Sequence, residues 1–172
     1  VQGLRQDGML EDRSIMDLLD PKFTWQSQML KANYEGNRKA PTEVQVQLFR
    51  RVPLDDPRRG GVITNAAIMT MTSTPTRTQP ITRGAWITSV IFNDPPKPPP
   101  ADVPPLPEVD REKLEKLTIR ERLAVHRKRA DCAGCHNKID PFGFALENYG
   151  PTGVWRDKYE NGREVDVSGV LF

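Results

Sequence analysis

Residues 131–147, DCAGCHNKIDPFGFALE, contain both cysteines of the 172-residue chain and one of its two histidines. The pattern Cys-x-x-Cys-His, here Cys132, Cys135 and His136, is typical of c-type haem attachment. Two thiols about one helical turn apart can add across the two vinyl groups of a haem and form thioethers, and the next residue then places its imidazole beneath the ring. The spacing therefore predicts one covalent haem c, with His136 as the proximal ligand of the iron.

Three other interpretations of these residues stay open. A structural zinc site would need all the cysteine and histidine of the chain: Cys132, Cys135, His126 and His136. Adjacent Cys and His ligands depart from the usual zinc spacing. A disulfide or a thioredoxin-like redox pair is typical of a β-α-β context, which the residues after the motif do not suggest. The third alternative is a pair of unrelated buried cysteines.

The residues that follow the motif predict an apolar wall for the haem site. We expect four side chains to exclude water from the ring: Pro141, Phe142, Phe144 and Leu146. Gly143 would let the backbone approach the haem closely, because it has no side chain. The alternative for this stretch is an ordinary hydrophobic turn. Asp140 and Glu147 are interpreted as structural, the first as a cap or turn residue.

The ligand on the other face of the iron is left open by the sequence. No methionine follows residue 71, which departs from the His/Met pattern of small class I cytochromes. His126 is the first candidate, because it lies on the predicted apolar face of its helix, where an imidazole is costly to bury without a partner. Met71 and Met69 are alternatives, and so is an open or water-filled site. Ligation by two histidines would lower the reduction potential relative to His/Met.

The clearest helix signature lies directly before the motif. Residues 117–130 contain a capping box, in which Thr118 precedes Glu121 by three positions. The arginines and lysines of this helix are interpreted mainly as a solvated face, with contact to haem propionates or an acidic redox partner as alternatives. A second helix is expected within residues 81–90, with Gly84 marking close packing.

The N-terminal half gives weaker signals. Residues 14–34 predict two short amphipathic helices, with Ser14 and Thr24 as N-caps, because a proline separates them. A short strand is expected within residues 48–54. Residues 57–78 fit a helix and a strand about equally well.

The predicted fold class is mainly α with long irregular segments, in which a helical region and a proline-rich tether precede a c-type haem-binding module. Residues 1–56 are the N-terminal helical segment, interpreted as the end of a preceding domain, and residues 57–93 are an apolar, helical part of the haem module. Eight prolines make residues 94–110 a stiff tether or strap. Residues 111–172 form the haem-binding region.

Composition limits the possible partners. The net charge of +2 and the pI near 8.6 are too mild to indicate nucleic acid. No apolar run approaches the roughly 20 residues that a membrane-spanning helix needs. The chain begins with Val1 rather than Met, so we expect a processed protein or a piece of a longer one. Thioether formation needs export and a haem-ligation apparatus, which predicts the bacterial periplasm or the cell surface.

Three blocks of the chain carry a specific resemblance. They are RGGVITNAAIMTMTSTPTRTQPITRGAWI, the proline run, and HRKRADCAGCHNKIDPFGFALENYGPTGVWR. Together, over about residues 58–157, they resemble an uncharacterised haem-bearing domain of planctomycete-type cytochrome c multi-domain proteins, with the pattern CxxCH-x3-DPxGFALE. In TQPITRGAW the chain departs from the serine-proline pair expected there. The resemblance implies a haem-binding module of undetermined substrate within a longer exported protein.

We therefore expect a module that carries one haem and transfers single electrons. Its expected partners are a redox protein or neighbouring haem domains, within a larger chain or complex. A haem enzyme, peroxidase-like or oxidase-like with an open distal site, is the first alternative. A structural module with zinc or a disulfide at the cysteine cluster is the second.

Overall fold

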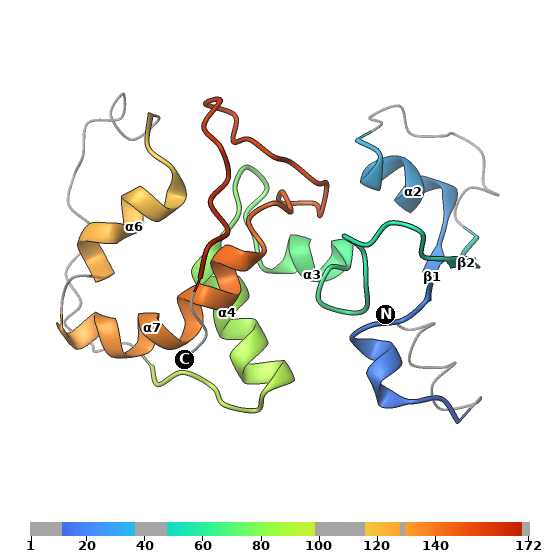
Figure 1. Cartoon of the computed structure of the whole chain (residues 1–172), viewed down its shortest axis with the longest axis horizontal. Helices are drawn as coiled ribbons and strands as arrows, with labels where there is room; N and C mark the ends of the chain where they lie inside the picture. Colours follow the sequence, from blue (N-terminus) through green and yellow to red (C-terminus); the bar gives the residue numbers. More distant parts are fainter. Residues whose placement is uncertain (1–11, 37–47, 99–115, 128–129, 170–172) are drawn as a thin grey trace. The chain divides into compact units, whose positions relative to one another are not determined.

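The computed structural model describes residues 12–36, 48–98, 116–127 and 130–169 (Figure 1). The chain divides into two compact units. The first unit comprises Val1–Arg77 with Tyr149–Trp155, and the second comprises Thr78–Asn148 with Arg156–Phe172. None of the described helices is long and apolar enough to cross a membrane.

The described residues of the first unit form a two-stranded antiparallel sheet and three short helical elements. These elements are η1 (Ile15–Leu18), β1 (Phe23–Gln26), α2 (Gln28–Tyr34), β2 (Arg50–Pro53) and α3 (Ala66–Met71). Phe23 pairs with Pro53, and Gln26 pairs with Arg50. The strand expected within residues 48–54 is confirmed by β2. Within residues 57–78, a helix (α3) forms over Ala66–Met71.

Of the two N-cap residues expected in this unit, the structure confirms one. Ser14 is confirmed as an N-cap, because its hydroxyl accepts a hydrogen bond from the backbone of Met16. Thr24 was expected to cap the second helix, and this was wrong. Thr24 lies within β1, and Ser27 caps α2 by accepting from Leu30 N at 3.1 Å. The β-branched and aromatic residues of β1 suit a pleated strand better than a helix start.

The second unit is built on the crossing of α4 (Pro80–Trp86) and α7 (Ala130–Ala145), which Figure 1 shows in green and orange. A Cβ at Gly84 would lie 2.0 Å from the carbonyl oxygen of Ile139, so the close packing expected at Gly84 is confirmed. A Cβ at Gly143 would lie 1.9 Å from the carbonyl oxygen of Pro80. The space beside Gly143 therefore accommodates the backbone of α4, which is a different role from the haem approach expected there.

The described part of the second unit has two further helices. The π-helical turn η3 (Ile87–Ile91) continues directly from α4, and α6 (Ile119–Arg127) packs against α7. The capping box of α6 is confirmed, because Thr118 N donates to Glu121 Oε2 at 2.8 Å and Glu121 N donates to Thr118 Oγ1 at 3.2 Å. Two otherwise unpaired amides at the start of α6 are thereby satisfied.

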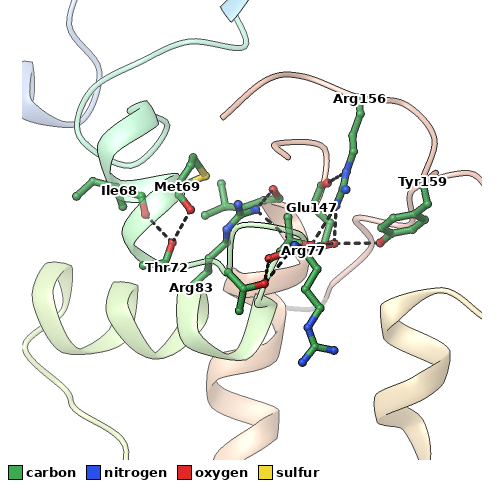
Figure 2. A network of polar contacts seen from close by, with 11 residues as sticks. Ile68, Met69, Thr72, Arg77, Arg83, Glu147, Arg156 and Tyr159 are labelled. Atoms are coloured by element: carbon green, nitrogen blue, oxygen red, sulfur yellow. Dashed lines mark hydrogen bonds and ion pairs between the residues drawn. The ribbon is translucent and has the colours of Figure 1, made fainter. Parts of the chain in front are cut away.

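A buried carboxylate holds the segments that follow α7. The Glu147 side chain is fully buried, and its Oε2 accepts hydrogen bonds from Thr78 Oγ1 at 2.9 Å, Arg156 Nη2 at 3.1 Å and Tyr159 OH at 3.2 Å (Figure 2). Its Oε1 lies 3.9 Å from Nη1 of Arg83, whose side chain is also fully buried. Loss of hydration raises the pKa of Glu147 more than the two arginines lower it. The structural role expected for Glu147 agrees with this network.

Two expectations about organisation stay predictions. Only residues 94–98 of the proline-rich tether belong to the described part of the chain. The described residues form helices and one two-stranded sheet. The division into residues 1–56, 57–93, 94–110 and 111–172 stays a prediction, and so does the haem-binding fold class.

Candidate functional site

Helix α7 carries the Cys-x-x-Cys-His motif through its first half. Cys132, Cys135 and His136 occupy positions i, i+3 and i+4, so they lie on one face of this helix. Cys132 is buried, Cys135 is half-buried, and the His136 side chain is 12% exposed. Both sulfurs are free thiols in the structure. Two thiols and an imidazole on one helix face form the donor set that covalent haem attachment requires, so the residues present fit a haem c.

A carboxylate one turn further along α7 holds the imidazole. Nδ1 of His136 lies 2.8 Å from Oδ1 of Asp140, and Oδ2 of Asp140 accepts from Arg127 Nη1 of α6 at 3.2 Å. Asp140 is 4% exposed. Asp140 was expected to be a cap or turn residue, and this was wrong, because the helix continues through it and through Pro141 to Ala145.

A cavity of about 510 Å³ lies at His136. Its volume falls within the roughly 300–1,000 Å³ that is typical of ligand and cofactor sites. Arg120, Ala124 and Arg127 line it from α6, where they stand at i, i+4 and i+7. The remaining lining residues come from α7 and the C-terminal segment: His136, Asn137, Asp140, Pro141, Phe144, Ser168 and Gly169.

The wall of this cavity combines an aromatic ring with two cations. The guanidinium carbon of Arg120 lies 4.1 Å from the centre of the Phe144 ring, and that of Arg127 lies 5.7 Å from it. Arg120 also forms an ion pair with Asp166 at 3.0 Å and donates to the carbonyl oxygen of Ser168. Arg120 and Arg127 therefore belong to the cavity rather than to a wholly solvated helix face.

Of the four side chains expected to form the apolar wall, two line this cavity. Pro141 and Phe144 line it together with His136. Phe142 instead packs against Phe92, with ring centres 5.2 Å apart, and the carbonyl oxygen of Leu146 accepts from buried Arg83. Among the described residues that line the cavity, neither cysteine occurs.

The candidate ligands for the other face of the iron lie in different parts of the chain. Met69 and Met71 belong to α3 of the first unit, where Met69 is fully buried and Met71 is 63% exposed. His126 belongs to α6, but its side chain lies outside the described residues. The identity of this ligand stays a prediction.

Within the described residues, no group of three or more His, Cys, Asp or Glu side chains is arranged to hold a metal ion. The zinc alternative includes His126, whose side chain is not described.

Sequence reasoning gave Asp140 only a structural role and Arg120 no role at this site, and it considered Arg127 only as an alternative contact to a haem propionate. The signal for Asp140 was its position four residues after His136, which places the two side chains together on a continuous helix. The signal for the arginines was their own i, i+7 spacing, which puts both on one face of α6.

The chain matches a protein-family model. The sequence model of the family PSCyt3, described as "Protein of unknown function (DUF1588)", matches residues 59–159. No curated protein and no solved structure shows a significant match to the chain.

Proposed function

Because the chain belongs to the PSCyt3 family, whose name suggests a planctomycete cytochrome c-related domain, we propose that it is a c-type cytochrome module. In this proposal one haem c is bound by thioethers to Cys132 and Cys135, with His136 as the proximal iron ligand. The protein transfers single electrons within an exported bacterial assembly, in the periplasm or at the cell surface. A redox protein or neighbouring haem domains are its partners.

The observation that carries the proposal is the composition of one face of α7. Both cysteines of the chain and His136 stand at i, i+3 and i+4 there, and a cavity of about 510 Å³ lies at the imidazole. When bound, the haem supplies one-electron chemistry between ferric and ferrous iron. The thiols attach it, His136 ligates it, and Pro141 and Phe144 exclude water beside the imidazole.

Covalent haem is the direct test. The full chain is produced with an export signal in a bacterium that has a haem-ligation apparatus, and it is then separated by denaturing electrophoresis and stained for haem. We expect stained protein, a pyridine haemochrome spectrum of c type, and a redox titration that follows a one-electron curve. The double variant Cys132→Ser, Cys135→Ser should remain folded and lose the stain.

The matched control is Gly134→Ala, between the two cysteines. An added Cβ there has no neighbouring atom within 4 Å, so this variant should retain the haem. Folded wild-type protein without covalent haem would refute the proposal. Haem-loaded protein whose spectrum changes on addition of peroxide or carbon monoxide would favour a haem enzyme over a carrier.

A further inference from the structure

We propose that Asp140 is a positioning residue for His136, and that Arg127 controls how strongly Asp140 acts on the imidazole. This inference rests on the proposed function, because it assigns the two residues a role toward a haem iron. Which ring nitrogen of His136 carries the proton can be measured without haem.

The geometry assigns the proton on the imidazole. A carboxylate oxygen only accepts hydrogen bonds, so the contact of 2.8 Å between Asp140 Oδ1 and His136 Nδ1 requires a proton on Nδ1. In a neutral ring the lone pair is then on Nε2, which becomes the ligating nitrogen. Ligating histidines commonly donate their other N–H to a carboxylate, which orients the ring and makes the ligand more basic.

Burial makes this pair stronger than an ordinary surface pair. The side chain of Asp140 is 5% exposed and that of His136 is 12% exposed. Solvent therefore screens the contact weakly, and the i, i+4 spacing on α7 holds the two groups together without a flexible loop.

Arg127 occupies the second oxygen of the same carboxylate. Its Nη1 lies 3.2 Å from Asp140 Oδ2, while Oδ1 faces the imidazole, so the two partners share one negative charge. The guanidinium partly neutralises the charge of the carboxylate, so the hydrogen bond that Asp140 accepts from His136 is weaker than it would be without Arg127. The two residues are thus expected to have opposite effects on a ferric ion bound to Nε2.

The test measures the reduction potential of the haem-loaded full chain. Asp140→Asn removes the charged acceptor, so the ferric form loses stabilisation and the potential should rise. A tenfold change in the ratio of ferric to ferrous affinity corresponds to about 59 mV, and we expect a rise of at least that size. Arg127→Gln should lower the potential, because the charge of Asp140 then acts on His136 alone.

The control makes the same chemical change at an exposed pair. Asp94 contacts Lys138 of α7 at 2.5 Å, and their side chains are 57% and 51% exposed. Asp94→Asn should leave the potential unchanged, because solvent screens this pair. A purely structural role of Asp140 in joining α6 to α7 would change stability in both the Asp140 and Arg127 variants without shifts of opposite sign.

Nitrogen NMR of the unloaded full chain separates this inference from the proposed function. His136 should carry its proton on Nδ1 in the wild type, lose that preference in Asp140→Ala, which leaves no acceptor, and recover part of it in Asp140→Glu. Wild-type tautomer in Asp140→Ala, or an unchanged potential in haem-loaded Asp140→Asn, would overturn the role of Asp140. A potential that does not fall in Arg127→Gln would overturn the role of Arg127. Absence of haem from all variants would refute the proposed function, while the tautomer would still decide the role of Asp140.

Discussion

The close crossing of α4 and α7 predicts how much stability the protein loses when Gly143 is replaced by alanine. Its hydrogen faces the backbone of Pro80, and the Cβ of an alanine would lie 1.9 Å from the carbonyl oxygen and 2.6 Å from the carbonyl carbon of that residue. Ordinary contact begins at 3.4 Å, so Gly143→Ala falls roughly 1.5 Å short of the separation it needs. The clashing atoms are backbone, and they cannot rotate away as a flexible side chain would.

The loss of unfolding free energy in Gly143→Ala follows from this geometry. Overpacking a tight contact destabilises proteins by about 1–3 kcal/mol, and a backbone neighbour puts this site at the upper end, about 3 kcal/mol. For a chain of this length each 1 kcal/mol lowers the melting temperature by roughly 2–4 °C, so Gly143→Ala should lower it by roughly 6–12 °C. Gly134→Ala makes the same change on the same helix in open space. There alanine should stabilise by about 0.5–1 kcal/mol, because it fits a helix better than glycine.

The assay is thermal unfolding of the unloaded full chain, followed by far-ultraviolet circular dichroism. The two glycine variants should shift the melting temperature in opposite directions. A Gly143→Ala protein that melts at or above the wild-type temperature would refute the close crossing of α4 and α7. If that variant kept its stability and failed only to bind haem, Gly143 would serve the approach of a haem rather than the packing of two helices.

Three other changes test the second unit. Glu147→Ala leaves buried Arg83 without its carboxylate and should cost about 3–5 kcal/mol in urea unfolding, whereas Glu164→Ala, at an exposed pair with Lys158, should cost about 1 kcal/mol or less. Burial raises the pKa of Glu147 above its ordinary value of 4.5, so the native state keeps this proton at a pH where the unfolded chain has lost it. The contribution of Glu147 to the unfolding free energy should therefore fall as pH rises from 4.5 through the raised pKa. The difference in unfolding free energy between wild type and Glu147→Gln should change over the same pH range. Thr118→Ala removes one half of the capping box and should cost about 1 kcal/mol, with helix content reduced at elevated temperature; an unchanged midpoint would contradict the cap.

Features that depend on neighbours in the sequence could be predicted from it. The capping box of Thr118 and Glu121 satisfies amides within one turn, so its spacing alone predicts where α6 begins. Close packing at Gly84 follows from the absence of a side chain within an apolar helix. The candidate haem donors could be predicted in the same way, because Cys132, Cys135 and His136 fall within five positions of the sequence.

Features that depend on distant partners could not be predicted in this way. Thr24 is a reasonable N-cap by residue type, but β1 forms because it pairs with β2, about 30 positions later in the chain. The network at Glu147 joins Thr78 to Tyr159, and no local pattern links them. In both cases tertiary pairing outweighs local propensity.

Pro141 shows how a sound local rule can hide a functional residue. Proline within a helix loses one backbone hydrogen bond, here to the carbonyl of residue 137, and this cost suggests a helix end near Asp140. In the structure α7 continues, because packing on α4 beside Gly143 and the ion pair of Asp140 with Arg127 offset that loss. Only on a continuous helix do His136 and Asp140 stand one turn apart and form their hydrogen bond. The contact that orients the proposed iron ligand is therefore a consequence of tertiary packing, although both residues lie within the quoted motif.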